Sequence, residues 1–450
     1  MNQLDTITAA FSALAWGMPL LILLIGGGIF FLLYSNFIPY RYLGHAIGVL
    51  RGKYDDPNDP GDIDHYEALS TALASTIGMG NISGVAVAIA TGGPGALFWM
   101  WMTAIVGMAT KFFTCTLAIM YRGKDSKGDV QGGPMYFIME GLGEKWKAVA
   151  VFFSVAALIG ALPLFNANQF TQALTDVLLV PNGIEDSFQS KFIIGVFITI
   201  LVSIVIFGGI KRIAAVAGKL VPLMVVLYTL MVIYIILLNA EKIPESFSLI
   251  FSDAFSGDAL LGGAIGELIR TGVKRGAFSN EAGIGTAPMA HGAAKTAQPV
   301  REGLVAMLGP AIDTLIVCTM TALAIIMTGV QRDGEENGIS LTLKAFESAM
   351  PGVGAYLLMI CVAIFALSSL FTFSYYGSKR LGFLIGAEKQ HFYNYFYVAS
   401  ICFGAAVSID SVINIIDGAY GLMAFPTMIA ALAMAPRVKA AAKEYFQSMS

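Results

Sequence analysis

The stretch Ser75–Gly84, with the sequence STIGMGNISG, decides the fold, because it places small and polar residues where a membrane helix is usually apolar. It lies within residues 69–90, which carry no charged side chain and exceed the length of about 20 residues that a helix needs to cross a bilayer. Its centre holds Gly78, Gly80, Asn81, Ser83 and Gly84. The stretch therefore predicts a membrane helix that is interrupted near its middle.

The whole chain has the composition of an all-α membrane protein. Of its 450 residues, 56% are hydrophobic and 13% are charged, and the mean hydropathy is +0.73. Typical soluble domains contain roughly 25% charged residues. A net charge of −3 gives no indication of nucleic-acid binding. The four cysteines are widely spaced in apolar segments, which is typical of buried thiols and not of disulfides or a metal site.

Eleven hydrophobic spans are predicted. Their ranges are 15–37, 68–92, 95–121, 146–178, 191–209, 213–239, 262–292, 303–329, 353–385, 392–409 and 412–435. Lysine and arginine concentrate in alternate loops, whereas others are acidic, such as NGIEDSF at 182–188. Basic loops lie on the cytoplasmic side of a membrane. We therefore expect a multi-pass protein of the plasma membrane with its N-terminus outside and its C-terminus in the cytoplasm.

The eleven spans divide into one extra span and two sets of five. The corresponding parts are an N-terminal span with a cytoplasmic loop at 1–66, a first repeat at 67–240, a second repeat at 241–436 and a cytoplasmic tail at 437–450. Because each repeat has an odd number of spans, the two repeats must have opposite orientations in the membrane, as in inverted-repeat transporters.

A second interruption is predicted in the seventh span, at the same place in the second repeat. Residues 270–288 read RTGVKRGAFSNEAGIGTAP and contain glycines, polar residues and charges. Two interrupted spans at corresponding positions indicate a transporter binding site. An unwound helix exposes amides and carbonyls that lipid cannot satisfy but a small zwitterion can. The alternative is that the glycines only form packing faces between helices.

Three further groups of polar residues each allow two interpretations. The charged residues of the seventh span either contact the substrate or an ion, or form ion pairs that brace the break; they are Glu267, Arg270, Lys274, Arg275 and Glu281. A polar face of the fourth span either lines the site or holds helices together; it comprises Phe165, Asn168, Gln169 and Gln172. The hydroxyls of the ninth span either suit a small hard cation or bond to their own helix; they belong to Ser368, Ser369 and Thr372.

Two motifs carry a family resemblance. Gly92–Gly107, GGPGALFWMWMTAIVG, resembles the signature of the sodium:alanine (alanine or glycine:cation) symporter family, and GVKRGAFSNEAGIGTAP at 272–288 resembles another segment of that family. The family belongs to the amino acid–polyamine–organocation group. The resemblance implies a leucine-transporter-type 5+5 inverted repeat, formed by spans two to six and seven to eleven, with spans two and seven broken. It also implies import of alanine, and usually glycine, together with sodium.

The resemblance also implies which residues form the site. The amides of Met79 and Gly80 would hold the substrate carboxylate, and the carbonyls of Thr76 and Ile77 would serve its amine or sodium. The expected substrate-binding residues are Thr76, Ile77, Met79, Gly80, Asn81, Phe165, Asn168, Gln169, Thr271, Gly272, Gly276, Phe278 and Ser279. The expected sodium ligands are Ala74, Ile77, Phe365, Ser368 and Ser369.

The sequence therefore favours a sodium-coupled symporter that works by alternating access as a monomer in the lipid bilayer. Its substrates are expected to be alanine and glycine, with sodium as the coupling ion and no other cofactor. The alternative is a proton-coupled carrier, for which Glu267 and Glu281 are the nearby titratable groups. An intramembrane enzyme is disfavoured because no HExxH motif occurs and Asp313 and Asp417 lack an evident motif. A channel gives no reason for two broken helices.

Overall fold

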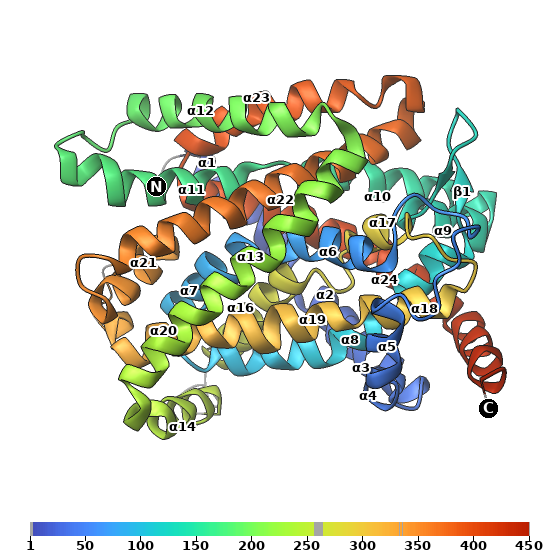
Figure 1. Cartoon of the computed structure of the whole chain (residues 1–450), viewed down its shortest axis with the longest axis horizontal. Helices are drawn as coiled ribbons and strands as arrows, with labels where there is room; N and C mark the ends of the chain where they lie inside the picture. Colours follow the sequence, from blue (N-terminus) through green and yellow to red (C-terminus); the bar gives the residue numbers. More distant parts are fainter. Residues whose placement is uncertain (1–2, 256–263, 333, 335, 450) are drawn as a thin grey trace.

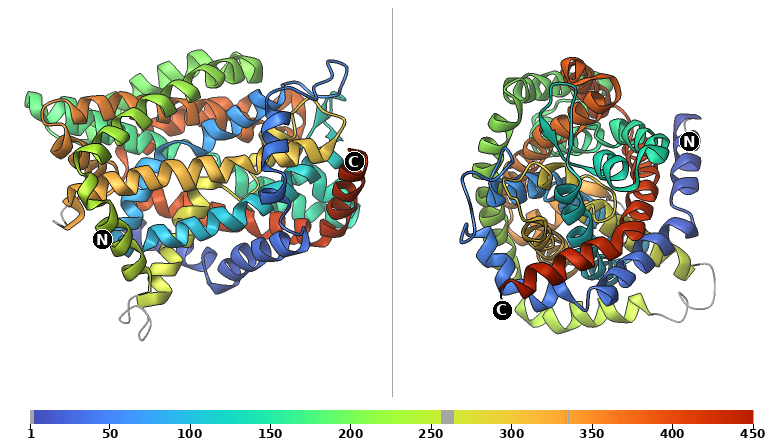
Figure 2. Two further views of the ribbon diagram at one scale, coloured as in Figure 1. Left: turned by 60° about the horizontal axis from the view of Figure 1, so that its bottom comes forward. Right: turned by 90° about the vertical axis from the view of Figure 1, so that its right-hand side faces the viewer.

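The computed structural model describes residues 3–255, 264–332, 334 and 336–449, and these residues form an almost entirely helical bundle (Figure 1). Most long helices run along one common axis, and the end-on view shows them arranged around a central group (Figure 2). Two short strands, β1 (Gly123–Lys124) and β2 (Val130–Gln131), pair antiparallel in a loop at one end. The predicted all-helical architecture is confirmed.

The helices follow the predicted spans closely. The first half of the chain contains α1 (Gln3–Ala15), α2 (Met18–Leu21), α3 (Gly27–Tyr34), α4 (Ile38–Arg41), α5 (Leu43–Leu50), α6 (His65–Thr76), α7 (Met79–Gly92), α8 (Ala96–Met120), α9 (Pro134–Leu142), α10 (Lys147–Gly160), α11 (Leu164–Leu174), α12 (Phe188–Ile206) and α13 (Gly209–Leu238). The second half contains α14 (Ile243–Ala254), α16 (Ala264–Asn280), α17 (Ala287–His291), α18 (Pro299–Ala306), α19 (Leu308–Pro310), α20 (Thr319–Thr328), α21 (Gly338–Ala349), α22 (Gly354–Ile385), α23 (Phe392–Ala406) and α24 (Ile409–Gln447).

Eight helices in the described residues are long and apolar enough to span a membrane, and a ninth span results if the bent pair Asp5–Ala15 and Met18–Tyr34 counts as one. Two of the eleven predicted spans, the seventh and the tenth, are not among these helices. The seventh span carries several charges and is broken, and its first two residues, 262–263, lie outside the described residues. The tenth corresponds to α23, whose 15 residues extend only about 22 Å, short of the roughly 30 Å of a hydrocarbon core.

The broken span formed by α6 and α7 lies at the centre of the bundle (Figure 1). The most apolar window of His65–Gly92 is 100% buried, whereas the corresponding windows of Phe188–Ile206 and Lys211–Leu238 are 28% and 33% buried. The outer helix α12 exposes large apolar side chains such as Phe192 and Phe197. A soluble protein exposes polar side chains and buries apolar ones. Here the outer helices expose apolar side chains, and the central span, which has polar residues around its break, is buried. This arrangement suits a bundle surrounded by lipid.

Loops that carry cations come together at one end of the bundle. The Arg122 guanidinium donates to the carbonyl oxygens of Pro60 at 3.0 Å and Gly292 at 2.9 Å. Arg301 donates to the carbonyl oxygen of Tyr54 at 2.8 Å. These arginines therefore join loops that precede and follow the two broken spans.

Candidate functional site

The first break separates α6 from α7 and consists of Ile77 and Gly78. The Gly78 amide donates to Asn81 Oδ1 at 3.0 Å. Gly78 has an extended backbone, with φ −152° and ψ −147°, so a positive φ is not the reason for glycine here. A β-carbon at this position would collide with Ser369 Oγ on α22. Glycine at this position leaves room for the Ser369 hydroxyl beside the break.

The second break separates α16 from α17 and is longer, covering residues 281–286. Glu281, Gly283 and Gly285 have left-handed backbones, with φ values of 54°, 85° and 100°. The turn therefore lies in the NEAGIGT part of the predicted segment. Its backbone needs the two glycines because other residues rarely adopt this conformation.

Thr271, Gly272 and Gly276 lie within α16, N-terminal to the break, and not in it. A β-carbon on Gly272 would lie 2.5 Å from the Cβ of Trp99, and one on Gly276 would collide with the Thr103 hydroxyl. Both partners belong to α8. The two glycines thus allow α16 and α8 to pack closely, which is the alternative that the sequence left open. Thr271 borders Gly92 and lines a separate vestibule.

The two breaks meet at a small cavity inside the bundle. A β-carbon on Gly80 would lie 3.4 Å from the Phe278 ring and 3.5 Å from Ser279 Cα. The cavity has a volume of about 20 Å³. The lining residues are Ser75, Thr76, Gly80, Gly160, Leu162, Phe165, Asn166, Phe278, Glu281, Phe373, Ile416 and Tyr420. Of the predicted substrate residues, Thr76, Gly80, Phe165 and Phe278 line this cavity.

Two helix ends of opposite polarity face each other across these breaks. The first amides of a helix have no acceptor within it, so the amides of Met79 and Gly80 at the start of α7 are directed towards the break. The last carbonyls of α16 lack donors within the helix, although that of Ala277 accepts from the Glu281 amide at 3.0 Å. The helix dipoles therefore favour a negative group near α7 and a positive group near α16.

Aromatic rings form one wall of the cavity. The rings of Phe165 and Phe278 lie edge to face with centroids 5.1 Å apart, and the Tyr420 ring lies 5.5 Å from Phe278. Phe165 and Phe278 are 3% and 9% exposed. These rings narrow the cavity on this side.

Asn81 and Ser279 brace the breaks from behind the cavity. The Asn81 side-chain amide donates to Asp313 Oδ1 at 2.8 Å, and the Ser279 hydroxyl donates to Asp313 Oδ2 at 2.7 Å. Asp313 lies in the π-helical segment η6 (Ala311–Cys318), a type of distortion that is frequent at functional sites. One buried carboxylate therefore ties the start of α7 to the end of α16.

Asn168 and Gln169 also connect helices and do not line the cavity. Asn168 donates to the carbonyl oxygen of Val407 at 2.8 Å, and Gln169 Oε1 accepts from the Ile339 amide at 3.0 Å. The interhelical interpretation of this face thus describes their contacts. The neighbouring Asn166 lines the cavity instead.

The predicted cation ligands gather where α6 passes α22. Ser369 Oγ donates to the carbonyl oxygens of Ala74 at 2.9 Å and Phe365 at 3.1 Å, and Ser368 Oγ donates to that of Phe365 at 3.0 Å. The first of these bonds crosses between helices, while the others bond the hydroxyls to their own helix. Neutral hydroxyl and carbonyl oxygens at the end of a broken helix are suitable ligands for a small hard cation. Ile77 follows directly in the break.

The charges of α16 form ion pairs above the cavity. Lys274 Nζ lies 2.7 Å from Asp417 Oδ2, and Arg275 pairs with the same carboxylate on α24. The Arg275 guanidinium lies 5.1 Å from the centre of the Phe278 ring. Both cations thus form ion pairs, as one of the two interpretations predicts. They also border a vestibule of about 270 Å³ that includes Arg270.

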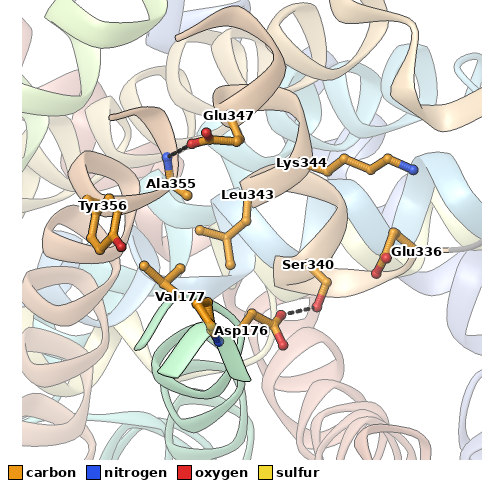
Figure 3. Close-up of a pocket in the computed structure, with 10 residues that line it drawn as sticks. Asp176, Val177, Glu336, Ser340, Leu343, Lys344, Glu347, Ala355 and Tyr356 are labelled. Carbon is orange, nitrogen blue, oxygen red and sulfur yellow. Dashed lines mark hydrogen bonds between the residues drawn. The ribbon is translucent and has the colours of Figure 1, made fainter. Parts of the chain in front are cut away.

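A larger pocket of about 410 Å³ lies away from both breaks, between the end of the fourth span and α21 (Figure 3). There Ser340 donates to Asp176 Oδ2 at 2.6 Å, and the Ala355 amide donates to Glu347 Oε2 at 3.1 Å. Neither helix break contributes a residue to this pocket. Its size alone does not make it the functional site.

Sequence reasoning missed several residues of the cavity. Ser75, Asn166, Phe373, Tyr420 and Glu281 all line it but were not predicted as substrate residues. Ser75 begins the quoted stretch STIGMGNISG, and Asn166 lies beside the predicted face of the fourth span. Phe373 and Tyr420 carry no comparable local signal, because their helices bring them to the cavity only in three dimensions.

A small cavity between two broken helices, inside a bundle of membrane spans, defines a membrane transporter. The chain belongs to the sodium:alanine symporter family, which it matches over residues 1–450. It is a multi-pass membrane protein of a family of sodium-coupled amino acid symporters, and it is not an enzyme.

Two relatives illustrate the range of the family. The chain is 40% identical to the sodium/alanine symporter AgcS of Methanococcus maripaludis, over 96% of this chain and 95% of that protein. It is 34% identical to the probable sodium/glutamine symporter GlnT of Bacillus subtilis, over 98% of this chain and 91% of that protein.

The fold is similar to that of a solved structure. The crystal structure of MhsT in complex with L-phenylalanine matches with a TM-score of 0.58 and 15% sequence identity, over 84% of this chain and 98% of that chain. This likeness shows the shared fold of the two proteins.

Proposed function

We propose that the protein imports a small neutral amino acid, alanine or glycine, together with sodium by alternating access. The observation that carries the proposal is the narrow cavity where the two helix breaks meet. The amides at the start of α7 suit a carboxylate, and the carbonyls at the end of α16 suit an ammonium group. An α-amino acid carries both groups on one carbon.

The size of the cavity supports a small substrate. The cavity has a volume of about 20 Å³, and the Phe165 and Phe278 rings restrict the width of this cavity. A methyl group or a hydrogen atom fits beside these rings more easily than a longer side chain. Alanine and glycine are therefore better candidates than glutamine, which the name of the relative GlnT suggests as an alternative.

The oxygens around Ser369 support sodium as the coupling ion. They link α6 to α22 directly below the first break, so a bound cation would hold the half-helix that shapes the substrate site. Cation binding would thereby favour substrate binding, and the coupling would be reciprocal.

The proposed orientation places the basic end of the bundle in the cytoplasm, with the 5+5 inverted repeat spanning 67–240 and 241–436. The Arg122 and Arg301 contacts at that end support this arrangement. A cysteine at Asn337 should react with an impermeant maleimide from outside the cell, whereas one at the exposed Lys127 should not. The opposite labelling pattern would reverse the proposed orientation.

Counterflow of labelled alanine in proteoliposomes tests the function. We expect uptake that depends on sodium, that stops when choline replaces sodium, and that excess glycine inhibits far more strongly than excess glutamine or leucine. Uptake that persists in choline and follows a proton gradient would favour the proton-coupled alternative. Equal inhibition by glutamine would reject the proposed substrate class.

A further inference from the structure

The cavity contains a carboxylate that neither the predicted substrate site nor the predicted cation site includes. Among the described residues that line the cavity, Glu281 is the only acidic one, and none is basic. It is 2% exposed and is the first residue after α16. A charged group at this position faces whatever ligand occupies the space between the breaks.

Neutral donors hold the Glu281 carboxylate in place. Oε1 accepts from the Tyr420 hydroxyl at 3.1 Å, and Oε2 accepts from the Thr286 hydroxyl and, at 3.4 Å, from that of Ser75. In the described parts of the chain, no lysine or arginine nitrogen lies within 4.0 Å of this carboxylate. Lys111 and Arg380 attract it only from a greater distance. Burial of a carboxylate without a cation in contact is costly.

The backbone at Glu281 is also unusual. Its φ of 54° is left-handed, which residues other than glycine rarely adopt, whereas the other two left-handed residues of this break are glycines. Strained residues of this kind concentrate at ligand sites. The strain and the unpaired charge occur at the same residue.

We propose that the Glu281 carboxylate is the counter-charge for the ammonium group of the transported amino acid. The substrate carboxylate would lie at the opposite side, near Gly80 and the start of α7, so the two ends of the zwitterion would each meet a complementary group. Glu281 would thereby select amino acids over carboxylates that lack an amino group. This inference rests on the proposed function.

Equilibrium binding to the purified full-length protein in saturating sodium tests the inference. The variants are Glu281→Gln, which removes the charge and keeps the shape, and Glu185→Gln, the same change at an exposed residue outside the cavity. The ligands are labelled alanine and, as its competitor without an amino group, propionate. Thermal stability is measured in parallel.

We expect Glu281→Gln to weaken alanine binding about 10- to 100-fold, the range for losing a hydrogen bond to a charged group. Propionate should not compete in the wild type but should compete measurably in this variant, because the repulsion between two carboxylates is gone. Glu185→Gln should behave as the wild type. If Glu281 had only a structural role, Glu281→Gln would weaken alanine binding without allowing propionate to compete, and this result would contradict the inference.

Two other results would also overturn it. Unchanged alanine affinity in Glu281→Gln, with exchange retained but net uptake lost, would assign the carboxylate to proton transfer.

If Glu281→Gln does not fold, Tyr420→Phe decides, because it removes only the hydroxyl that positions Oε1. We expect a several-fold loss of alanine affinity there, and unchanged affinity would contradict the inference. Absence of alanine binding in the wild type would instead reject the proposed function.

Discussion

The two broken helices differ in the length, the charge and the backbone conformation of their breaks. The first break is two residues long and carries no charge, and it is shaped by the close approach of Gly78 to Ser369. The second break is six residues long, contains two left-handed glycines and presents the Glu281 side chain to the cavity. In the proposed site, the first would therefore offer backbone groups to the substrate, and the second would add an acidic side chain.

Because of this difference, the two breaks would have different tasks in the proposed site. A short apolar break that packs against α22 can transmit the presence of a cation at Ser369 to the amides of α7. A longer polar break can turn the chain enough to direct a side chain inward. If the division holds, substitutions at the first break should affect coupling and those in α16 before the second break should affect packing.

The largest effect is expected for Gly78→Ala. The added methyl group would collide with Ser369 Oγ, so this hydroxyl, a proposed cation ligand, must turn away from its place beside the carbonyl oxygen of Ala74. We expect sodium-driven alanine uptake to fall at least about 100-fold, equivalent to about 2.8 kcal/mol. The matched control is Gly84→Ala, whose β-carbon would meet only ordinary contacts at 3.9 and 4.0 Å. Equal uptake by both variants in proteoliposomes would break the distinction between the two glycines.

The next effect concerns the hydroxyls of α22. Replacing Ser368 and Ser369 together by alanine removes two of the proposed cation ligands and the bond to the carbonyl oxygen of Ala74. We expect sodium dependence of uptake to be lost. Ser374→Ala is the control, because this buried hydroxyl donates to the carbonyl oxygen of Phe371 in its own helix, at 2.7 Å. Wild-type sodium dependence in the double variant would place the cation elsewhere.

A smaller effect is expected for Gly80→Ala. Its β-carbon would lie 3.4 Å from the Phe278 ring, so the helix tolerates it, but the methyl group would narrow the cavity. We expect alanine affinity to fall about tenfold, or about 1.4 kcal/mol, and glycine affinity to fall less because glycine lacks a methyl group. Binding of both amino acids to purified protein measures the difference. Unchanged affinities would mean that Gly80 does not border the substrate.

The smallest effect on binding is expected for Gly276→Ala. The added methyl group would press against Thr103 on α8 and not against the cavity. Overpacking of this kind costs typically 1–3 kcal/mol of stability. We therefore expect a lower thermal unfolding temperature and an alanine affinity within about twofold of the wild type, a change of about 0.4 kcal/mol. A tenfold loss of affinity without a loss of stability would move Gly276 into the substrate site.

The sequence located the first break more sharply than the second. In Ser75–Gly84 the glycines are close together in an uncharged span, so the predicted break is confined to a few residues. In residues 270–288 glycines recur throughout, and Gly276 and Gly283 look alike in the sequence. What separates them is α8, which packs against the first and not the second, and no local pattern contains that information.

Charged residues show the same limit. Arg380 lies near the end of the predicted ninth span, and it is fully buried in α22, where it donates to the carbonyl oxygen of Ala157 at 2.8 Å. Glu281 lies among the charges for which the sequence leaves both ligand contact and ion pairing open, and its partners in the structure are hydroxyls. Burial and pairing of a charge depend on helices distant in the sequence, such as the one that carries Tyr420.

An experimental structure with alanine and sodium bound tests the central claim most directly, namely that the meeting point of the two breaks is the substrate site. The account predicts alanine between Gly80 and Glu281, with its carboxylate at the start of α7, and sodium beside Ser369. Alanine bound instead in the vestibule beside Lys274, or in the pocket of Figure 3, with the space between the breaks filled only by protein, would contradict it.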